Sequence, residues 1–165
     1  GVNPLINALF NGHRLVMVIL DNSTTAMTGH QPNPGTGRAF GGINTEPLSI
    51  ESIVRGVGAK FVRTVDPYDI KAATEAMRDA VEFDGVAVVI SKQPCPLELK
   101  KRRMLEAKVC VVDQSKCIRC YTCLKTVACP ALTKKGDAVE TDPTQCIGCG
   151  MCGSVCPKGA IEVKR

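Results

Sequence analysis

Short apolar runs alternate with amphipathic stretches over residues 1–92. Residues 15–20 (LVMVIL) are continuously apolar and residues 85–90 (GVAVVI) repeat the pattern, as expected of strands that are buried on both faces of a sheet. Residues 60–65 form a third candidate strand, and residues 2–10 are typical of the end of an earlier helix. Strands that alternate with helices predict an α/β domain with a parallel sheet.

Two helices are predicted between these strands, over residues 47–57 and 66–83. In the second, we expect Asp66 to cap the helix and Pro67 to occupy its first turn, with Asp69 adding favourable charge near the start. The apolar positions of this helix share one face, which comprises Ile70, Ala73, Met77, Ala80 and Val81. Three strands make a thin sheet, so we expect the chain to be the C-terminal piece of a longer protein.

The second half of the chain is rich in cysteine. Eight of the ten cysteines follow two copies of one pattern, Cys117-x-x-Cys120-x-x-Cys123-x5-Cys129-Pro130 and Cys146-x-x-Cys149-x-x-Cys152-x3-Cys156-Pro157. Three thiolates at every third position surround one face of an iron–sulfur cube, and a distant fourth cysteine before a proline completes the other cluster. Two sets of four thiolates are the ligand count of two [4Fe–4S] clusters, so we expect the chain to carry single electrons.

Two other interpretations of the cysteines stay open. A disulfide scaffold is typical of small secreted domains, and zinc also binds four thiolates, although zinc sites typically use two separated C-x-x-C pairs. Cys95 and Cys110 lie outside the repeated pattern. Cys110 alternates into an apparent strand and is expected to be a small core residue, whereas Cys95, between two prolines, is a candidate redox-active thiol.

Charge divides the chain into two parts. Residues 1–94 hold 8 Lys/Arg and 9 Asp/Glu, whereas residues 95–165 hold 13 and 7. Each oxidised [4Fe–4S] centre contributes a charge of about −2, so the basic half mainly neutralises its own clusters and nucleic-acid binding is not supported.

We find no signal peptide and no apolar run long enough for a membrane span, which predicts a cytoplasmic protein without membrane contact. Residues 95–107 are expected to link two domains.

Residues 108–165 resemble the bacterial two-cluster ferredoxin fold, a small α+β domain. The motif DQSKCIRC recurs as DPTQCIGC, and each half is expected to form a strand, a cluster loop, a short helix and a return strand. Outer strands are expected over residues 109–112 and 160–163, with a turn at 135–137. The resemblance implies that one cluster is held by Cys117, Cys120, Cys123 and Cys156, and the other by Cys146, Cys149, Cys152 and Cys129. The first half departs from the pattern, with five residues before its Cys-Pro instead of three.

A long polar loop follows the first predicted strand. Residues 21–37 combine Asn, Ser and Thr side chains with several glycines, at the carboxyl end of a strand where parallel sheets place ligands. Asn side chains and backbone carbonyls suit Mg²⁺, which usually also binds a phosphate. On spacing alone, Asn22 is equally consistent with capping a turn, and His30 with an ordinary loop histidine.

The sequence VILDNSTTAMTGHQPNPG in this region resembles the second half of the thiamine diphosphate site of 2-oxoacid:ferredoxin oxidoreductases. Joined to a ferredoxin-like domain, the chain is most similar to the large (α) subunits of the indolepyruvate type. The resemblance implies that residues 1–94 are the C-terminal part of a thiamine diphosphate-binding domain. It gives Mg²⁺ a side-chain ligand from Asn22 and a backbone carbonyl from Thr24. The implied cofactor-binding residues are Asn22, Ser23, Thr24, Thr28, Gly29, His30 and Gln31.

This resemblance implies an oxidoreductase that decarboxylates a 2-oxoacid in a coenzyme A-dependent reaction, with indolepyruvate or another aryl pyruvate as the expected substrate. The implied cofactors are thiamine diphosphate, Mg²⁺ and two [4Fe–4S] clusters, and the implied partners are a smaller (β) subunit and an external ferredoxin. An upstream Mg²⁺-binding aspartate and the pyrimidine-side domain of the family would precede Gly1, so the fragment alone is not expected to be active. The alternative is an electron-transfer module that carries a non-functional remnant of the thiamine diphosphate domain.

Overall fold

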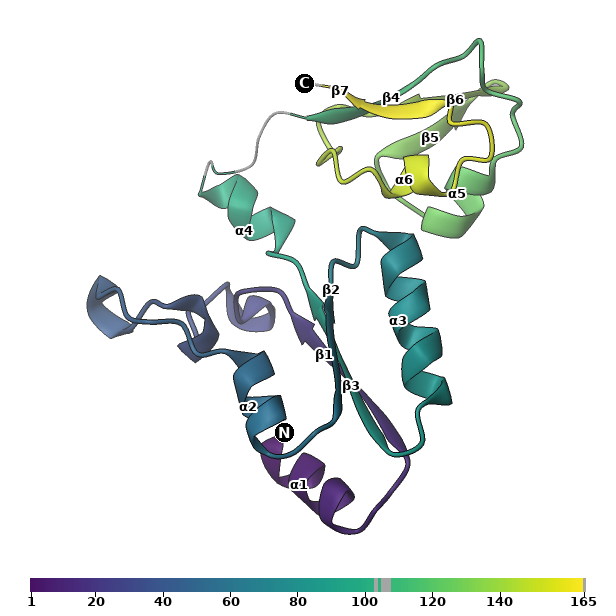
Figure 1. Ribbon diagram of the computed structural model, residues 1–165. Helices are drawn as coiled ribbons and strands as arrows, with labels where there is room; N and C mark the ends of the chain where they lie inside the picture. The colour runs from purple at the N-terminus through teal and green to yellow at the C-terminus, as the bar shows by residue number, and fades with distance from the viewer. Residues whose placement is uncertain (103, 105–107, 165) are drawn as a thin grey trace. The chain divides into compact units, whose positions relative to one another are not determined.

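The computed structural model describes residues 1–102, 104 and 108–164, and it divides into two compact units, Gly1–Glu98 and Leu99–Arg165 (Figure 1). The boundary falls inside the expected linker 95–107, of which residues 103 and 105–107 lie outside the described part. The linker begins with a short helix, α4 (Pro96–Lys101). Within the described residues, no helix combines the length and apolar character that a membrane span requires.

The first unit is an α/β domain, as the alternation of apolar and amphipathic stretches predicts. Its described strands form a parallel sheet in the order β1-β3-β2, with Leu15 opposite Val86 and Phe61 opposite Ala87. The elements follow each other as α1 (Val2–Phe10), β1 (Leu15–Asp21), α2 (Ile50–Gly56), β2 (Phe61–Val65), α3 (Ile70–Glu82) and β3 (Val86–Lys92). All three predicted strands are confirmed.

Only the central strand is buried on both faces. The five residues of β3 from Val86 to Ile90 are each at most 4% exposed. β1 was expected to be equally buried, but Val18 is 41% and Leu20 78% exposed. That prediction is wrong because β1 lies at the edge of the described sheet, whereas β3 has a paired strand on each side.

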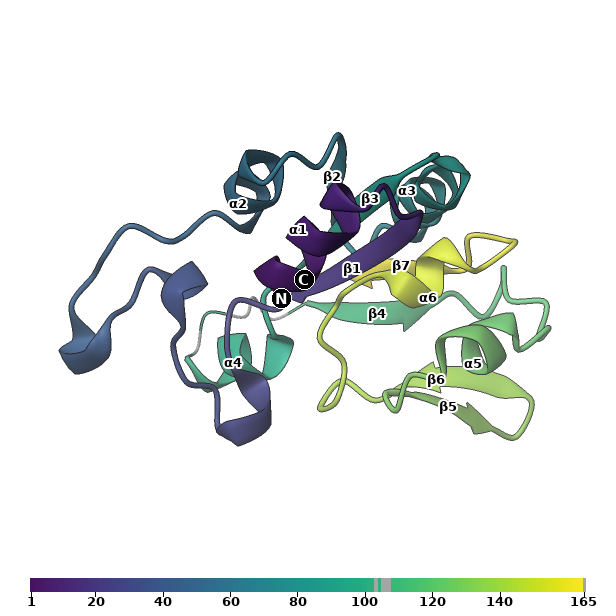
Figure 2. The ribbon, with the colours of Figure 1, turned by 90° about the horizontal axis from the view of Figure 1, so that it is seen from below.

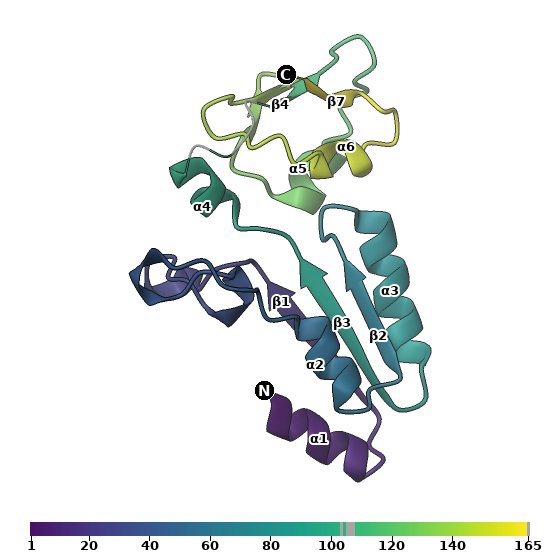
Figure 3. The ribbon, with the colours of Figure 1, turned by 60° about the vertical axis from the view of Figure 1, so that its left-hand side comes forward.

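The helices cover the two faces of this sheet separately, as Figure 3 shows. On one face, Leu5 of α1 and Val54 of α2 pack in one apolar cluster with Val88 and Ile90. On the other face, alanines of α3 pack against Ala87 and Val89. Successive residues of β3 point to opposite faces of the sheet, so this one strand supplies both clusters.

Helix α3 starts later than the sequence suggests. Its N-cap is Asp69, whose Oδ1 accepts a hydrogen bond from the Ala72 N–H at 3.0 Å. Asp66, the predicted cap, instead accepts from the Tyr68 N–H in the preceding turn. Asp66 and Asp69 are both suitable N-cap residues. Asp69 is the cap because it directly precedes the uninterrupted helical segment. Helix α2 likewise begins at Ile50 rather than 47, because the hydroxyl of Ser49 caps it.

The predicted apolar face of α3 is only partly correct. Ala76 and Ala80 are 1% exposed, whereas Met77 and Val81 are 37% and 61% exposed. Alanine has no side chain beyond Cβ, so it lets the helix backbone lie close to the strands. The buried face of α3 therefore centres on Ala76 and Ala80, and Met77 and Val81 lie at its solvent-exposed margin.

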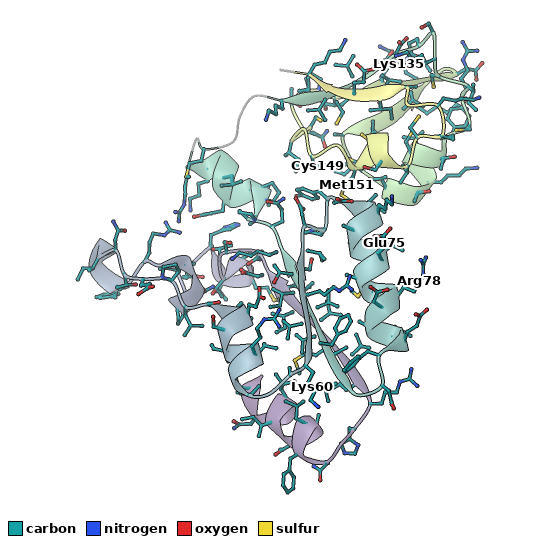
Figure 4. All side chains as sticks on the ribbon, viewed as in Figure 1. Lys60, Glu75, Arg78, Lys135, Cys149 and Met151 are labelled. Atoms are coloured by element: carbon teal, nitrogen blue, oxygen red, sulfur yellow. The ribbon has the colours of Figure 1, made fainter. Side chains whose placement is uncertain are left out.

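Replacing Asp69 with Ala is expected to lower the free energy of unfolding of the first unit by about 1 kcal/mol, the usual cost of losing an N-cap. The matched control is Glu75→Ala, because Glu75 is exposed in the middle of the same helix (Figure 4). That substitution is expected to stay within about 0.5 kcal/mol of the parent protein. Urea unfolding followed by circular dichroism measures both, and equal effects of the two variants would contradict the cap assignment.

The second unit consists of two similar halves, and each strand of one half pairs with a strand of the other. β4 pairs with β7 in antiparallel fashion, and β5 and β6 form a hairpin that turns at Gly136 (Figure 2). The elements are β4 (Val109–Val112), α5 (Thr122–Val127), β5 (Leu132–Lys135), β6 (Ala138–Thr141), α6 (Met151–Ser154) and β7 (Ile161–Lys164). The strand, loop, short helix and return strand expected of each half are confirmed.

The core of the second unit is small and rich in cysteine. Its described buried residues are Cys110, Cys123, Ala131, Leu132, Val139, Cys152, Ala160 and Ile161. Three of these eight are large aliphatic side chains, and none is aromatic. Such a core buries little apolar area, so another source of stabilisation is needed in a unit of this size.

Candidate functional site

The two cysteine loops begin with the same hydrogen-bonded turn. In the first, the Asp113 carbonyl accepts from the Cys117 N–H at 3.0 Å and its carboxylate accepts from the Ser115 hydroxyl and N–H. In the second, Asp142 makes the same contacts, with Thr144 in place of the serine. These hydrogen bonds lower the pKa of both carboxyl groups, and the bond from the hydroxyl has the larger effect. Each aspartate thereby fixes the first cysteine of its set.

The backbone of both loops then passes through the left-handed region at equivalent positions. In the second loop glycines occupy them, Gly148 at φ 66° and Gly150 at φ 79°. In the first loop the same positions hold Arg119 and Tyr121, each at φ 57°. A non-glycine residue in this region costs about 1 kcal/mol or more. Two loops of different composition therefore adopt one conformation, and the first does so under strain.

The first set of cysteines lines a single cavity. Cys117, Cys120 and Cys123 meet there with Cys156, which comes from the other half of the unit. Apolar side chains complete the wall, among them Val112, Ile118, Val139 and Ile161. The structure thus brings together the four residues that the resemblance assigns to one cluster.

The second set has Cys152 within α6 and Cys149 just before it. The Cys146 sulfur accepts N–H groups from Cys110 at 3.3 Å and from Gly148 at 3.4 Å. Cys152 interacts with Cys149 and Cys110. Cys149 lies on the segment that enters α6, next to Met151 (Figure 4). The remaining predicted member of this set, Cys129, packs partly buried against the same core.

Two of the proposed ligand thiols, Cys123 and Cys152, have a raised pKa, and a third, Cys120, has a lowered one. Burial raises the pKa of Cys123, and burial together with the Cys110 side chain raises the pKa of Cys152 to about 12. At Cys120 the Thr122 hydroxyl, 3.4 Å from the sulfur, lowers the pKa instead. Metal ligands must be thiolates, so loading iron onto the buried cysteines has to release protons.

No three Cys, His, Asp or Glu side chains of the described chain converge closely enough to hold a single metal ion. An iron–sulfur cube holds its ligand sulfurs further apart than one ion does. The cavity, the sulfur ligands and the N–H groups directed at them fit such a cube.

Gly148 is expected to be the least replaceable residue of the second loop. A Cβ on Gly148 would lie 2.6 Å from the Cβ of Lys108 and 2.8 Å from its carbonyl oxygen. The matched control is Gly136, which also has positive φ (+58°) but has open space around it. Gly136→Ala should cost about 1–2 kcal/mol from strain alone, whereas Gly148→Ala should cost about 1–3 kcal/mol more from the steric clash. Guanidinium unfolding and iron content of the two variants test this, and equal losses would contradict it.

A second group of candidate residues lies at the carboxyl end of β1. Asn22 Oδ1 accepts a hydrogen bond from the Thr24 N–H at 3.1 Å, so Asn22 does cap a turn. An amide oxygen has two lone pairs, and the second is available to a cation. Thr24 is only 5% exposed, and its hydroxyl donates to the Gln31 carbonyl at 3.3 Å. The turn therefore places the Asn22 oxygen and the Thr24 backbone, the two implied Mg²⁺ ligands, close together.

The TGHQ segment folds back onto this turn. Thr25 and Gln31 exchange backbone hydrogen bonds of 2.9 and 3.3 Å, which closes a tight loop around residues 26–30. Gly29 (φ 112°) and His30 (φ 63°) make the reversal. The Thr28 hydroxyl donates to Gln31 Oε1, and Gln31 Nε2 donates to the Thr28 backbone carbonyl. All the implied cofactor-binding residues, from Asn22 to Gln31, thus belong to one hydrogen-bonded loop.

The sequence did not reveal the contacts of Cys95. Its N–H donates to the Asn22 carbonyl at 2.9 Å, and its sulfur lies 3.6 Å from the His30 Nε2. The segment after β3 thereby contacts the candidate cofactor loop near its start, at Asn22, and near its end, at His30. Cys95 and His30 are 65 residues apart in the chain, and only the parallel pairing of β1 with β3 brings them together. The hard oxygen atoms of Asn22 and Thr24 fit Mg²⁺, and a cation held there could in turn bind a diphosphate.

Known proteins match both units. Residues 2–91 match the family described as "Thiamine pyrophosphate enzyme, C-terminal TPP binding domain", and residues 139–162 match the "4Fe-4S binding domain". The chain is 45% identical to the indolepyruvate oxidoreductase subunit IorA of Archaeoglobus fulgidus and 46% identical to that of Methanothermobacter thermautotrophicus, in each case over 98% of its own length. An archaeal-type glutamate synthase [NADPH] of Thermotoga maritima is 33% identical over 41% of the chain and 14% of its own length.

The chain spans 26% of the length of the IorA relatives. It resembles one part of that subunit, and the resemblance stated from the VILDNSTTAMTGHQPNPG motif and the cysteine repeats is confirmed. The match to the thiamine pyrophosphate domain covers more than half of the chain and includes the whole loop from Asn22 to Gln31. The chain therefore belongs to the thiamine pyrophosphate enzymes, as a C-terminal TPP-binding domain joined to a 4Fe–4S binding domain.

Proposed function

We propose that the chain is part of a 2-oxoacid:ferredoxin oxidoreductase that decarboxylates indolepyruvate or related aryl pyruvates in a coenzyme A-dependent reaction. Two [4Fe–4S] clusters would carry its electrons to an external ferredoxin, and a smaller subunit would complete the enzyme. The observation that carries the proposal is the presence, in one chain, of a TPP-binding domain and a ferredoxin-like unit with two sets of four cysteines. Relatives that match 98% of the chain are named indolepyruvate oxidoreductase subunits, which supports the substrate class.

The first unit would hold the Mg²⁺ and diphosphate end of the cofactor. Asn22 would bind the cation through its side-chain oxygen and Thr24 through its backbone carbonyl. The Ser23 hydroxyl and the His30 N–H would serve the diphosphate. Thr28, Gly29 and Gln31 donate hydrogen bonds within the loop and would hold its shape around the cofactor. Thiamine diphosphate, when bound, supplies the electron sink for decarboxylation. The protein's task at this end is to orient the cofactor, and the bonds from Cys95 and Gln31 hold the loop in place for it.

The second unit would hold the electron carriers. Cys117, Cys120, Cys123 and Cys156 would ligate one cluster, and Cys146, Cys149, Cys152 and Cys129 the other. Bound clusters supply one-electron carriers with potentials set by their surroundings. The excess of Lys and Arg over residues 95–165 offsets the negative charge that the clusters bring.

The experiment that tests this function is an anaerobic assay of the whole subunit with its partner. Coenzyme A-dependent reduction of a low-potential dye is followed with indolepyruvate, phenylpyruvate, pyruvate and 2-oxoglutarate in parallel. Turnover led by the two aryl pyruvates is expected. Turnover led by pyruvate or 2-oxoglutarate would keep the enzyme class and overturn the substrate. If no 2-oxoacid is turned over while dithionite still reduces the clusters, the chain is an electron-transfer module with a non-functional cofactor domain.

A further inference from the structure

Cys95 and His30 form a side-chain pair at the end of the candidate cofactor loop. The Cys95 sulfur lies 3.6 Å from the His30 Nε2, and both residues are partly buried. Among the hydrogen bonds and ion pairs of the described residues, no other one involves either of these two side chains. The pair therefore joins two residues that have no other described polar partner for their side chains.

The backbone fixes the place of the Cys95 sulfur. Cys95 stands between Pro94 and Pro96, and a following proline restricts the residue before it to extended conformations. Its N–H donates to the Asn22 carbonyl at 2.9 Å, just beyond the last paired residues of β1 and β3. The sulfur is thus held by the sheet rather than by the loop that it contacts.

His30 occupies a strained backbone position. Its φ of 63° lies in the left-handed region, which costs a residue other than glycine about 1 kcal/mol or more. The backbone hydrogen bonds between Thr25 and Gln31 enforce this conformation from both sides. Strain of this kind is concentrated at ligand-binding sites, where it holds a group ready for its ligand. The group at stake here is the His30 N–H, which is the proposed donor to the diphosphate.

We propose that Cys95 is a positioning residue whose side chain, by holding the imidazole of His30, keeps the end of the cofactor loop in the conformation that binds thiamine diphosphate. This inference rests on the proposed thiamine diphosphate function. Loss of the sulfur would release the loop at His30, whereas the backbone bond to Asn22 would still hold its start. A loop that is ordered before the cofactor arrives has less conformational entropy to lose on binding, so the pair raises affinity.

The test is a double-mutant cycle on Mg²⁺-dependent binding of thiamine diphosphate, measured by calorimetric titration of the whole subunit with its partner. Cys95→Ala and His30→Ala are each expected to weaken binding by about threefold to tenfold, the range that one hydrogen bond supports. The double variant is expected to bind no more weakly than the weaker single variant, because both substitutions remove the same contact.

Calorimetry also separates a lost position from a lost fold. An unfolded fraction lowers the number of binding sites, whereas a displaced His30 lowers the affinity of every site. Cys95→Ser keeps a hydrogen-bonding group on Cβ and is expected to recover part of the affinity. His13→Ala is the matched control and should bind like the parent protein, because His13 is an exposed histidine of the same unit that precedes β1, at the opposite end of that strand.

Three results would overturn the inference. The first is parent-like affinity in Cys95→Ala, and the second is a double variant whose loss equals the product of the two single losses. The third is Cys95→Ser that binds no better than Cys95→Ala, because the polar contact would then be irrelevant. A parent protein without Mg²⁺-dependent binding would defeat the proposed cofactor function itself, whereas normal binding by the parent beside unchanged variants would defeat this inference alone.

Discussion

Removing the iron is expected to unfold residues 109–164 while the sheet of the first unit remains folded. Three of the eight described buried core residues in the second unit are cysteines and two are alanines, so only Leu132, Val139 and Ile161 are large aliphatic side chains. Without clusters this core buries too little apolar surface to offset the entropy of an ordered chain. Structural metal sites supply on the order of 10 kcal/mol of folding free energy, so their loss exceeds the stability of a small domain.

Hydrogen exchange measured by mass spectrometry before and after chelation tests this expectation. Amides of β4 to β7 should lose protection, whereas those of β3 should keep it, because its residues from Val86 to Ile90 are buried in clusters that contain no cysteine. Retention of protection in β4 and β7 after complete iron removal would contradict the prediction. Loss of protection in both units would show that the clusters also stabilise the first sheet.

Replacing Asn22 with Ala is expected to weaken Mg²⁺-dependent binding of thiamine diphosphate by about 100-fold or more. The side-chain oxygen is the proposed cation ligand and also accepts the Thr24 N–H, so its loss removes a ligand and loosens the turn. Mutating even an outer partner of a metal ligand typically costs about 10–100-fold in metal affinity, and a direct ligand should cost at least as much.

Calorimetric titration of the whole subunit with its partner, with and without Mg²⁺, measures this affinity. Asn22→Asp retains an oxygen at the same place and should remain within about tenfold of the parent protein. Asn44→Ala is the matched control, since Asn44 is an exposed asparagine of the same long connection between β1 and α2. The proposed ligand would be wrong if Asn22→Ala and Asn44→Ala bound the cofactor equally well.

Local sequence signals were sufficient for most elements of the fold. The apolar run of β3 and the repeated DQSKCIRC and DPTQCIGC motifs depend on neighbours within a few residues, and the structure reproduces them. The burial of β1 was mispredicted because a strand's position in a sheet is decided by pairing, which no local pattern contains. The start of α3 was mispredicted because Asp66 and Asp69 are both capable of capping.

The candidate site shows the same division between local and long-range information. The motif identifies Asn22 and Thr24, and the turn that joins them is local. The contacts of Cys95 with His30 and of Cys110 with the second cysteine set join residues 36 or more positions apart. The sequence indicated these two cysteines only by their number, because ten cysteines for eight ligand positions leave Cys95 and Cys110 without a role.

The central claim is that one chain holds the cofactor half-site and the electron carriers that serve it. The most direct measurement mixes a 2-oxoacid with the anaerobic whole enzyme, without coenzyme A or external acceptor, and follows bleaching of the iron–sulfur absorption in a stopped-flow instrument. We expect bleaching in the parent protein, none in Asn22→Ala, and full bleaching of both by dithionite. Equal bleaching of Asn22→Ala by the 2-oxoacid, or none in a parent protein loaded with thiamine diphosphate and Mg²⁺, would contradict the claim.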